Sequence, residues 1–156
     1  MAAALEAARD LQGAVQTFVR TFGLLVTKQT PCGQPVSPSY AHALMLLLER
    51  ESGELVTTQS ELAAELGLDK SSITRLCARL EADERVRQQR AEGDGRSREL
   101  TLTAAGRKMA TNIQGASLQR FRRVVDALPR GKRRAVLDSL ELLTLAVAGL
   151  GEEEKT

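Results

Sequence analysis

Hydroxyl and basic side chains recur at helical spacing between Lys70 and Arg79. Apolar residues at i, i+3, i+4 and i+7 form one face of this segment, which we expect to be buried. The opposite face carries short hydroxyl side chains, which allow close approach to a DNA groove, and arginine, which can reach guanine or a phosphate. The apolar face consists of Ile73, Leu76, Cys77 and Leu80, and the polar side consists of Lys70, Ser71, Ser72, Thr74, Arg75, Ala78 and Arg79.

A second concentration of basic residues follows directly along the chain. Residues 85–89 and 98–102 are predicted strands, and the link between them, residues 90–97, contains Gly93-Asp94-Gly95, so the pair is expected to form a hairpin. A basic hairpin after such a helix is placed to touch phosphates or the minor groove. Between Arg85 and Arg98 the charged residues are Arg85, Arg87, Arg90, Arg96 and Arg98, against only Glu92 and Asp94.

The chain offers little for catalysis. It has one histidine, His42, and neither a nucleophile elbow nor a glycine-rich phosphate loop. No cluster of cysteine, histidine or acidic residues surrounds His42 in the sequence, so we predict no metal site and no cofactor. Cys77 lies on the apolar face and is expected to be an inert core residue. Cys32 lies in a loop rich in proline and glycine and is expected to be more exposed and open to oxidation.

Two short helices joined by a tight turn are predicted to position the polar face. Thr58-Gln59-Ser60-Glu61 has the form of a capping box, which starts a helix. Gly67 can end that helix in a left-handed turn, and Asp69 can cap the next helix, from Lys70 to about Ala82. This order is typical of a helix-turn-helix, and the hairpin would make it a winged one.

Longer helices are predicted on both sides of this unit. Apolar residues near the N-terminus alternate at spacings of four and three, so a helix there should end before Pro31 and present one seam to a partner helix. Another helix before the helix-turn-helix should start at Ser37-Pro38. After the hairpin, one helix should start after Thr103, and the last helix should cover residues 132–148. That last helix is apolar around most of its circumference, and a chain of 156 residues can hardly bury it and the seam alone, so we predict a homodimer through both termini. The seam consists of Leu11, Val15, Phe18, Phe22 and Leu25.

Composition favours a mainly α fold with a small β-hairpin. Aromatic residues make up only 3% of the chain and tryptophan is absent, which favours packed helices over a β-sandwich. We predict one intertwined domain, with an N-terminal dimerisation helix over 1–36, the winged helix-turn-helix over 37–103, C-terminal dimerisation helices over 104–150 and an acidic tail over 151–156. No apolar run is long enough for a bilayer and no signal peptide is evident, so a cytoplasmic protein without membrane contact is expected.

Three stretches resemble the multiple antibiotic resistance regulator (MarR) family, in the family's order and spacing. The resemblance extends at the level of motifs from Thr57 to Gly106, and the order of helices extends it over most of the chain. It implies a bacterial, dimeric regulator that binds a pseudo-palindromic operator in double-stranded DNA, in most cases as a repressor, often relieved by a small phenolic effector or by oxidation. The stretches are Thr58-Gln59-Ser60-Glu61-Leu62-Ala63, Leu66-Gly67-Leu68-Asp69-Lys70-Ser71-Ser72-Ile73-Thr74-Arg75-Leu76, and Asp94-Gly95-Arg96-Ser97-Arg98 through Leu102-Thr103-Ala104-Ala105-Gly106.

The resemblance also implies roles for single residues. Ser71, Ser72, Thr74 and Arg75 would face the major groove. Arg96 would enter the minor groove from the tip of the wing, and Asp94 would orient the wing arginines. Tyr40 and His42 are candidates for lining an effector crevice, with packing or solvent contact as their alternative. The expected DNA-contacting set is Lys70, Ser71, Ser72, Thr74, Arg75, Arg79, Arg87, Asp94, Arg96 and Arg98.

Three other interpretations fit the same residues. The chain could be a regulator that responds to oxidation, or one that needs no effector. From a different class, it could be a winged-helix module that binds a protein without reading DNA. Arg75, Arg96 and the hydroxyl-rich helix face argue against the protein-binding module.

Overall fold

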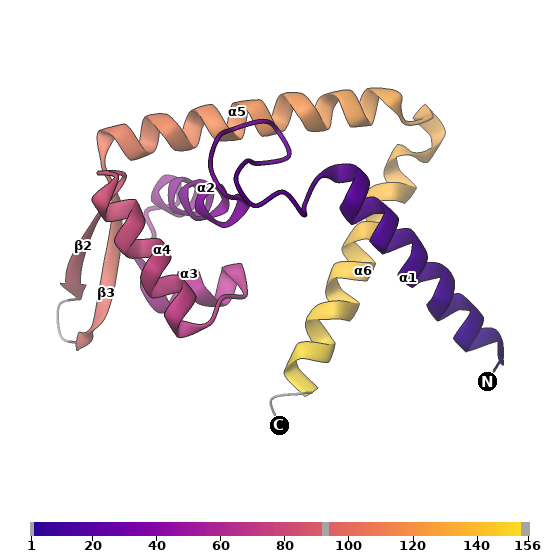
Figure 1. Ribbon diagram of the computed structural model, residues 1–156, viewed down its shortest axis with the longest axis horizontal. Helices are drawn as coiled ribbons and strands as arrows, with labels where there is room; N and C mark the ends of the chain where they lie inside the picture. The colour runs from indigo at the N-terminus through magenta and orange to yellow at the C-terminus, as the bar shows by residue number, and fades with distance from the viewer. Residues whose placement is uncertain (1, 92–93, 154–156) are drawn as a thin grey trace. The chain divides into compact units, whose positions relative to one another are not determined.

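The computed structural model describes residues 2–91 and 94–153, and side chains for residues 3–90 and 97–151. Its elements confirm the prediction of a mainly α protein with a small β-wing (Figure 1). The chain divides into two compact units, Met1–Ser117 and Leu118–Thr156, and the division falls within the long helix α5. In order, the elements are α1 (Ala2–Phe22), α2 (Pro38–Ser52), β1 (Thr57–Thr58), α3 (Gln59–Leu66), α4 (Lys70–Ala82), β2 (Val86–Ala91), β3 (Asp94–Leu102), α5 (Ala104–Ala127), the 3-10 helix η1 (Arg130–Lys132) and α6 (Arg133–Glu153).

The two helices of the predicted helix-turn-helix are α3 and α4, and their caps are those expected. Thr58 and Glu61 form a reciprocal capping box, in which the Glu61 carboxylate accepts from the Thr58 N–H at 2.8 Å. Gly67 ends α3 at a φ of 62°, in the left-handed region that glycine adopts without strain. Asp69 caps α4 by accepting from the Ser72 N–H at 2.8 Å. The turn is therefore specified by local contacts that the sequence already contains.

The sheet has three antiparallel strands in the order β1-β3-β2. Strand β1 was not predicted, because two residues are too few to show an alternating pattern. The predicted link over residues 90–97 is wrong in extent: β2 continues to Ala91, and Asp94 and Gly95 already belong to β3. Pairing continues past the expected strand ends with a register irregularity between Arg90 and Ala91, which sequence spacing does not reveal.

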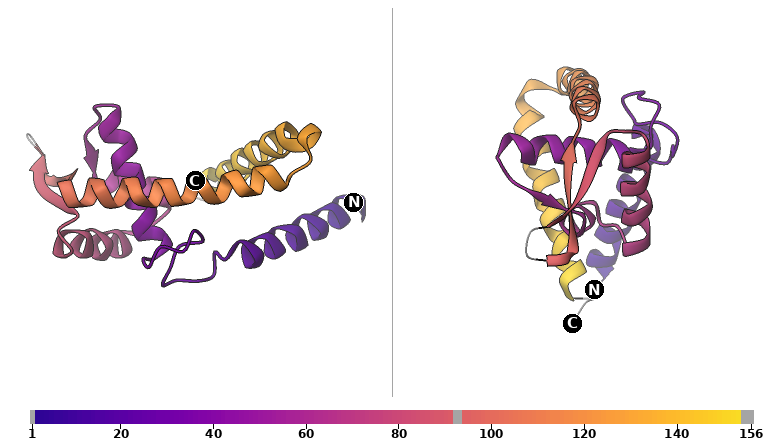
Figure 2. Two further views of the ribbon diagram at one scale, coloured as in Figure 1. Left: turned by 90° about the horizontal axis from the view of Figure 1, so that it is seen from above. Right: turned by 90° about the vertical axis from the view of Figure 1, so that its left-hand side faces the viewer.

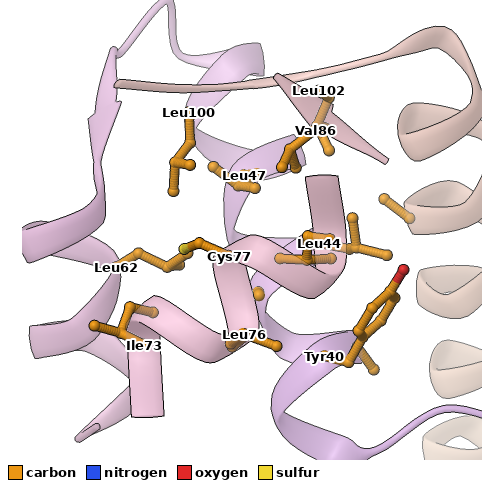
Figure 3. Packing of buried hydrophobic residues seen from close by; sticks show 14 of the residues in the cluster. Tyr40, Leu44, Leu47, Leu62, Ile73, Leu76, Cys77, Val86, Leu100 and Leu102 are labelled. Carbon is orange, nitrogen blue, oxygen red and sulfur yellow. The ribbon is translucent and has the colours of Figure 1, made fainter. Parts of the chain in front are cut away.

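The core of the first unit lies between α2, α3, α4, the sheet and the start of α5 (Figure 3). The predicted apolar face of α4 is buried, including Cys77, which is 1% exposed. The hairpin of β2 and β3 runs beside α4, as the right-hand view of Figure 2 shows. The largest fully buried side chains are Leu44, Leu62, Leu80, Ile113, Val86 and Cys77.

Helix α5 starts against the base of the wing. The Thr103 hydroxyl caps it by accepting from the Gly106 N–H at 2.9 Å, and the same hydroxyl donates to the Glu84 carbonyl at 2.7 Å. A Cβ atom on Gly106 would lie only 1.9 Å from the Arg85 carbonyl oxygen. This close approach needs glycine, and it ties the end of α4 to the beginning of α5.

The first and last helices differ from prediction at their ends. Helix α1 ends at Phe22, so Leu25 lies outside the helical seam in which it was predicted. The reason is Gly23, which takes a φ of 88° and closes the helix with bonds from the Gly23 and Leu24 N–H groups to the carbonyls of Arg20 and Val19. Helix α6 continues to Glu153, five residues past the predicted end.

Exposed apolar side chains are concentrated on these two helices. On α1, Leu11 and Phe18 are 49% and 53% exposed, and on α6, Leu142 and Leu145 are 68% and 64% exposed. Within the described residues, no helix is long and apolar enough to span a membrane. In a single chain, α1 and α6 therefore both leave apolar side chains exposed to water.

Candidate nucleic-acid interface

The N-terminal end of α4 is organised by one carboxylate. Asp69 accepts from the Ser72 N–H and from the hydroxyls of Ser71 and Ser72 at 2.8–2.9 Å. These bonds, the backbone bond foremost, lower the pKa of the fully exposed Asp69 to about 2. The two serines are therefore held in fixed rotamers at the end of the helix that was predicted to meet a base edge.

Thr74, in the middle of the exposed face of α4, is held from two sides. Its hydroxyl donates to the Lys70 carbonyl at 2.7 Å and accepts from the Gln59 side-chain amide at 3.0 Å. Gln59 was not among the predicted site residues. The signal that could have found it is its position as the first residue of α3, next to the capping box.

The register of the wing separates its residues onto two faces, because directly opposed residues of a strand pair share a face. Val86 pairs with Leu102 and Gln88 pairs with Leu100, and the leucines and Val86 are buried. Arg90 pairs with Arg98 and so lies on this same inner face. Arg87 pairs with Thr101 and lies on the outer face. The wing thus brings Arg98 toward α4 but leaves Arg87 on the other side.

A groove of about 720 Å³ lies between α3, α4 and the inner face of the wing. Three of the predicted DNA-contacting residues, which are separated in the sequence, line this groove together: Lys70, Thr74 and Arg98. Its polar wall is held together by Glu81, whose carboxylate accepts from the Gln88 side-chain amide at 2.9 Å and from the Gln88 N–H at 3.3 Å. The other lining residues are Gln59, Ser60, Ala63, Ile73, Ala78, Glu81 and Gln88.

Two arginines stand side by side at the outer end of this groove. Arg90 and Arg98 are directly opposed across the hairpin, and both side chains are exposed. Like charges at opposed positions destabilise a strand pair. An anion between them would relieve that repulsion, so the pair suits a phosphate. Arg90 was counted in the basic stretch but was not predicted as a site residue, because only the register reveals its neighbour.

The opposite edge of α4 carries Ser72, Arg75 and Arg79, spaced by three and four residues. An Arg75 amino group lies 3.5 Å from the Ser72 hydroxyl. Arg79 lies farther along, with its guanidinium carbon 5.6 Å from the centre of the Tyr40 ring and its Nε 3.8 Å from Asp83. The two arginines therefore follow the edge of the polar face rather than the groove beside the wing.

The remaining predicted residues have separate positions. The side chains of Asp94 and Arg96 lie outside the described residues. Tyr40 is 2% exposed and packs in the core, and its hydroxyl donates to Asp83 at 3.0 Å. His42 is exposed, so these two effector candidates lie in different environments. In the described parts of the chain, no group of three or more histidine, cysteine or acidic residues could hold a metal ion.

The central segment of the chain is similar to a known protein family. A model of the MarR family matches residues 34–97. A search of curated proteins found no match. Streptococcus pneumoniae FabT, solved in complex with DNA, is 16% identical with a TM-score of 0.70, over 94% of this chain and 99% of that chain.

Two further solved structures share the fold. S. aureus MepR, solved in a DNA complex, is 18% identical with a TM-score of 0.64, over 71% of this chain and 80% of that chain. The PcaV transcriptional regulator from Streptomyces coelicolor, solved with its natural ligand, is 23% identical with a TM-score of 0.58, over 90% of this chain and 91% of that chain. At these identities the matches show a common fold.

Proposed function

Because residues 34–97 match the MarR family, we propose that this DNA-binding transcriptional regulator acts as a homodimeric repressor of a pseudo-palindromic operator. In this proposal, α4 enters the major groove and the wing follows the adjacent backbone. A small-molecule effector releases the operator. The protein performs no catalysis.

The observation that carries the proposal is the polar groove between α4 and the wing. It places the hydroxyl of Thr74 and the charges of Lys70 and Arg98 around one concave surface. Arg90 extends the positive charge outward, and Arg75 adds it at the other edge of α4. Hydroxyl groups and arginine at a helix face read bases, and flanking cations position the phosphate backbone. Arg87, which pairs with Thr101, lies on the outer face of the wing and not in this groove.

Homodimer formation is supported by the exposed apolar surfaces of α1 and α6. Phe18 stacks on Phe22 with ring centroids 5.2 Å apart, so that α1 carries an ordered aromatic ridge. Helix α6 exposes Leu137, Leu140, Leu142 and Leu145 to at least 55%. Large contiguous apolar surfaces mark interfaces in soluble proteins, and a closed two-fold dimer is the simplest way to cover both.

Repression and effector release are proposed from the structures that share this fold. PcaV, which has the same fold, is described in complex with its natural ligand, and MepR and FabT are described in complexes with DNA. We propose that the present chain binds both DNA and a small-molecule ligand. Phenolic acids are the first compounds to test, since the sequence resemblance implies them.

Selection of bound sequences from a random duplex library tests the proposal directly. A two-fold symmetric reader should enrich a pseudo-palindrome with half-sites about 10 bp apart. Binding should weaken steeply with salt, by a slope in log K of about −0.9 for each phosphate neutralised. Enrichment of no sequence, together with affinity that is flat in salt, would replace the proposal with a protein-binding module.

Sedimentation and ligand titration test the finer parts. The protein should sediment as a dimer at micromolar concentration, and a monomer there would remove the dimer from the proposal. The selected operator should be released when a phenolic acid is added. Retention of the operator with every compound of a phenolic series would favour a regulator that needs no such effector.

A further inference from the structure

The only tyrosine of the chain joins α2 to α4, the proposed recognition helix for DNA. Tyr40 is the third residue of α2, and its ring is 2% exposed. The hydroxyl donates to the Oδ2 of Asp83 at 3.0 Å. Asp83 is the C-cap residue of α4, and its N–H bonds to the Arg79 carbonyl at 2.9 Å. Tyr40 therefore restrains the last turn of the recognition helix at a point 43 residues away in sequence.

The same ring also contacts the last arginine of α4. The Arg79 guanidinium carbon lies 5.6 Å from the ring centre, within the range of a cation–π contact. The Nε of Arg79 lies 3.8 Å from the Asp83 Oδ2 that accepts from Tyr40. The side chain of Arg79 is nonetheless 66% exposed. It is restrained at two points while its charge remains accessible to solvent.

Arg79 lies on the edge of α4 that also carries Ser72 and Arg75. An arginine at the edge of a groove-binding helix meets a phosphate more readily than a base. A free arginine side chain loses much rotamer entropy when it is fixed on a ligand, so holding it in place beforehand raises affinity.

We propose that Tyr40 is a positioning residue for DNA binding: with Asp83 it holds Arg79 at the edge of the recognition helix, ready for a phosphate of the operator backbone. This inference rests on the proposed function. It gives Tyr40 a role different from lining an effector crevice. Burial and the bond to Asp83 raise the pKa of Tyr40 to about 12, so the hydroxyl remains a donor at any working pH.

The test is a mutant cycle on the full-length protein and the selected operator. Tyr40→Leu removes the ring contact and the hydroxyl, and it should weaken binding about tenfold, or about threefold for each subunit of the dimer. Tyr40→Phe keeps the ring, so its affinity for the operator should lie between those of Tyr40→Leu and the wild type. In an Arg79→Ala background, neither substitution should weaken binding further. A purely structural role would weaken binding equally in both backgrounds.

A matched control separates packing from positioning. Leu44, also on α2, is fully buried and takes no part in the ion pair or the ring contact of Arg79. Leu44→Val should lower the midpoint of urea unfolding, while its effect on binding should be the same with and without Arg79. Unfolding midpoints of all variants establish that binding is measured on folded protein.

The outcomes distinguish this inference from the proposed function. Wild-type protein that binds no duplex would overturn the proposed function and this inference with it. Wild-type binding together with a Tyr40→Leu effect that persists in Arg79→Ala would overturn the inference alone. So would an Arg79→Ala variant with wild-type affinity.

Discussion

The Gln59 side-chain amide donates to the Thr74 hydroxyl at 3.0 Å, which joins the first residue of α3 to the middle of the recognition helix. The hydrogen of that hydroxyl is directed to the Lys70 carbonyl. Thr74 therefore cannot donate to a base acceptor without breaking a bond, and its methyl group and the second lone pair of its hydroxyl are left for recognition. A threonine methyl group can contact the C5 methyl of thymine.

Replacing Thr74 tests this division of roles. Thr74→Ser keeps the hydroxyl and loses the methyl, so it should weaken operator binding by about 0.8 kcal/mol per lost methyl contact. Substituting deoxyuridine for thymidine in the operator should weaken binding by the wild-type protein by a similar amount. The same substitution should not weaken binding by Thr74→Ser any further. Thr74→Val keeps the methyl and should remain sensitive to deoxyuridine. Equal sensitivity of wild type and Thr74→Ser would show that the methyl makes no base contact.

The arginine pair of the wing should respond in opposite directions to two measurements. Arg90→Ala removes a like charge opposite Arg98, so it should raise the free energy of unfolding by about 0.2–1 kcal/mol in the absence of DNA. The same change should weaken operator binding and lower the salt slope by about 1 per subunit, because a phosphate contact is lost.

Arg87 provides the comparison for this pair within the same strand. It lies on the outer face, opposite Thr101, so Arg87→Ala should change the salt slope less than Arg98→Ala does. Affinities at several salt concentrations for the three alanine variants are sufficient. A larger loss for Arg87→Ala than for Arg98→Ala would mean that the outer face of the wing, rather than the groove, meets DNA.

The contrast between these arginines shows how far the sequence could lead. Thr58, Gly67 and Asp69 are local signals, because a cap and its partners lie within a few residues, so α3 and α4 were predicted with their ends. The strand register depends on pairing between distant segments, and no local pattern contains it. For this reason β1 and the inner position of Arg90 became visible only in the structure. The bond between Gln59 and Thr74 depends on the packing of α3 on α4, which no local pattern contains either.

Tertiary contacts explain other limits in the same way. The role of Tyr40 depends on Asp83, 43 residues later, and periodicity along α2 shows only that the ring is buried. Leu25 matched the spacing of the N-terminal seam, but Gly23 in a left-handed turn had already ended α1. The backbone conformation of Gly23 thus ended the helix, although the apolar spacing continued to Leu25.

Gly106 should be intolerant of any side chain. A Cβ atom there would lie 1.9 Å from the Arg85 carbonyl oxygen, so Gly106→Ala should force α5 away from the base of the wing. Such overpacking costs about 1–3 kcal/mol of stability, measurable by urea unfolding. At Gly115 in the same helix, a Cβ atom would meet nothing within 4 Å, so Gly115→Ala should raise stability by up to about 1 kcal/mol. Equal effects of the two changes would contradict the close approach.

Acid should affect the recognition helix through Asp69. Its pKa in the folded protein is about 2, because the Ser72 N–H and the hydroxyls of Ser71 and Ser72 bond to the charged form. The value in the unfolded chain is about 3.9, so the stabilisation is fully present above about pH 4 and is lost as the pH falls through 2. Asp69→Asn keeps an acceptor without a titrating charge, so its stability should vary less between pH 4 and pH 2. A carboxyl titration by NMR with a midpoint near 4 would contradict the bonding described.

The two cysteines should differ sharply in reactivity. Cys77 is 1% exposed, and burial together with the nearby Glu81 raises its thiol pKa to about 11. Cys32 is partly exposed, with its sulfur 3.0 Å from the Thr30 hydroxyl. Because the thiolate is the reactive form, iodoacetamide at pH 8 should modify Cys32 in the native protein and Cys77 only after unfolding, as followed by mass spectrometry.

Mild oxidation should leave operator binding largely intact, with Cys32→Ser as the control. Binding that is lost on oxidation in wild type, is kept in Cys32→Ser and returns with a thiol reductant would instead make Cys32 the switch of an oxidation-responsive regulator.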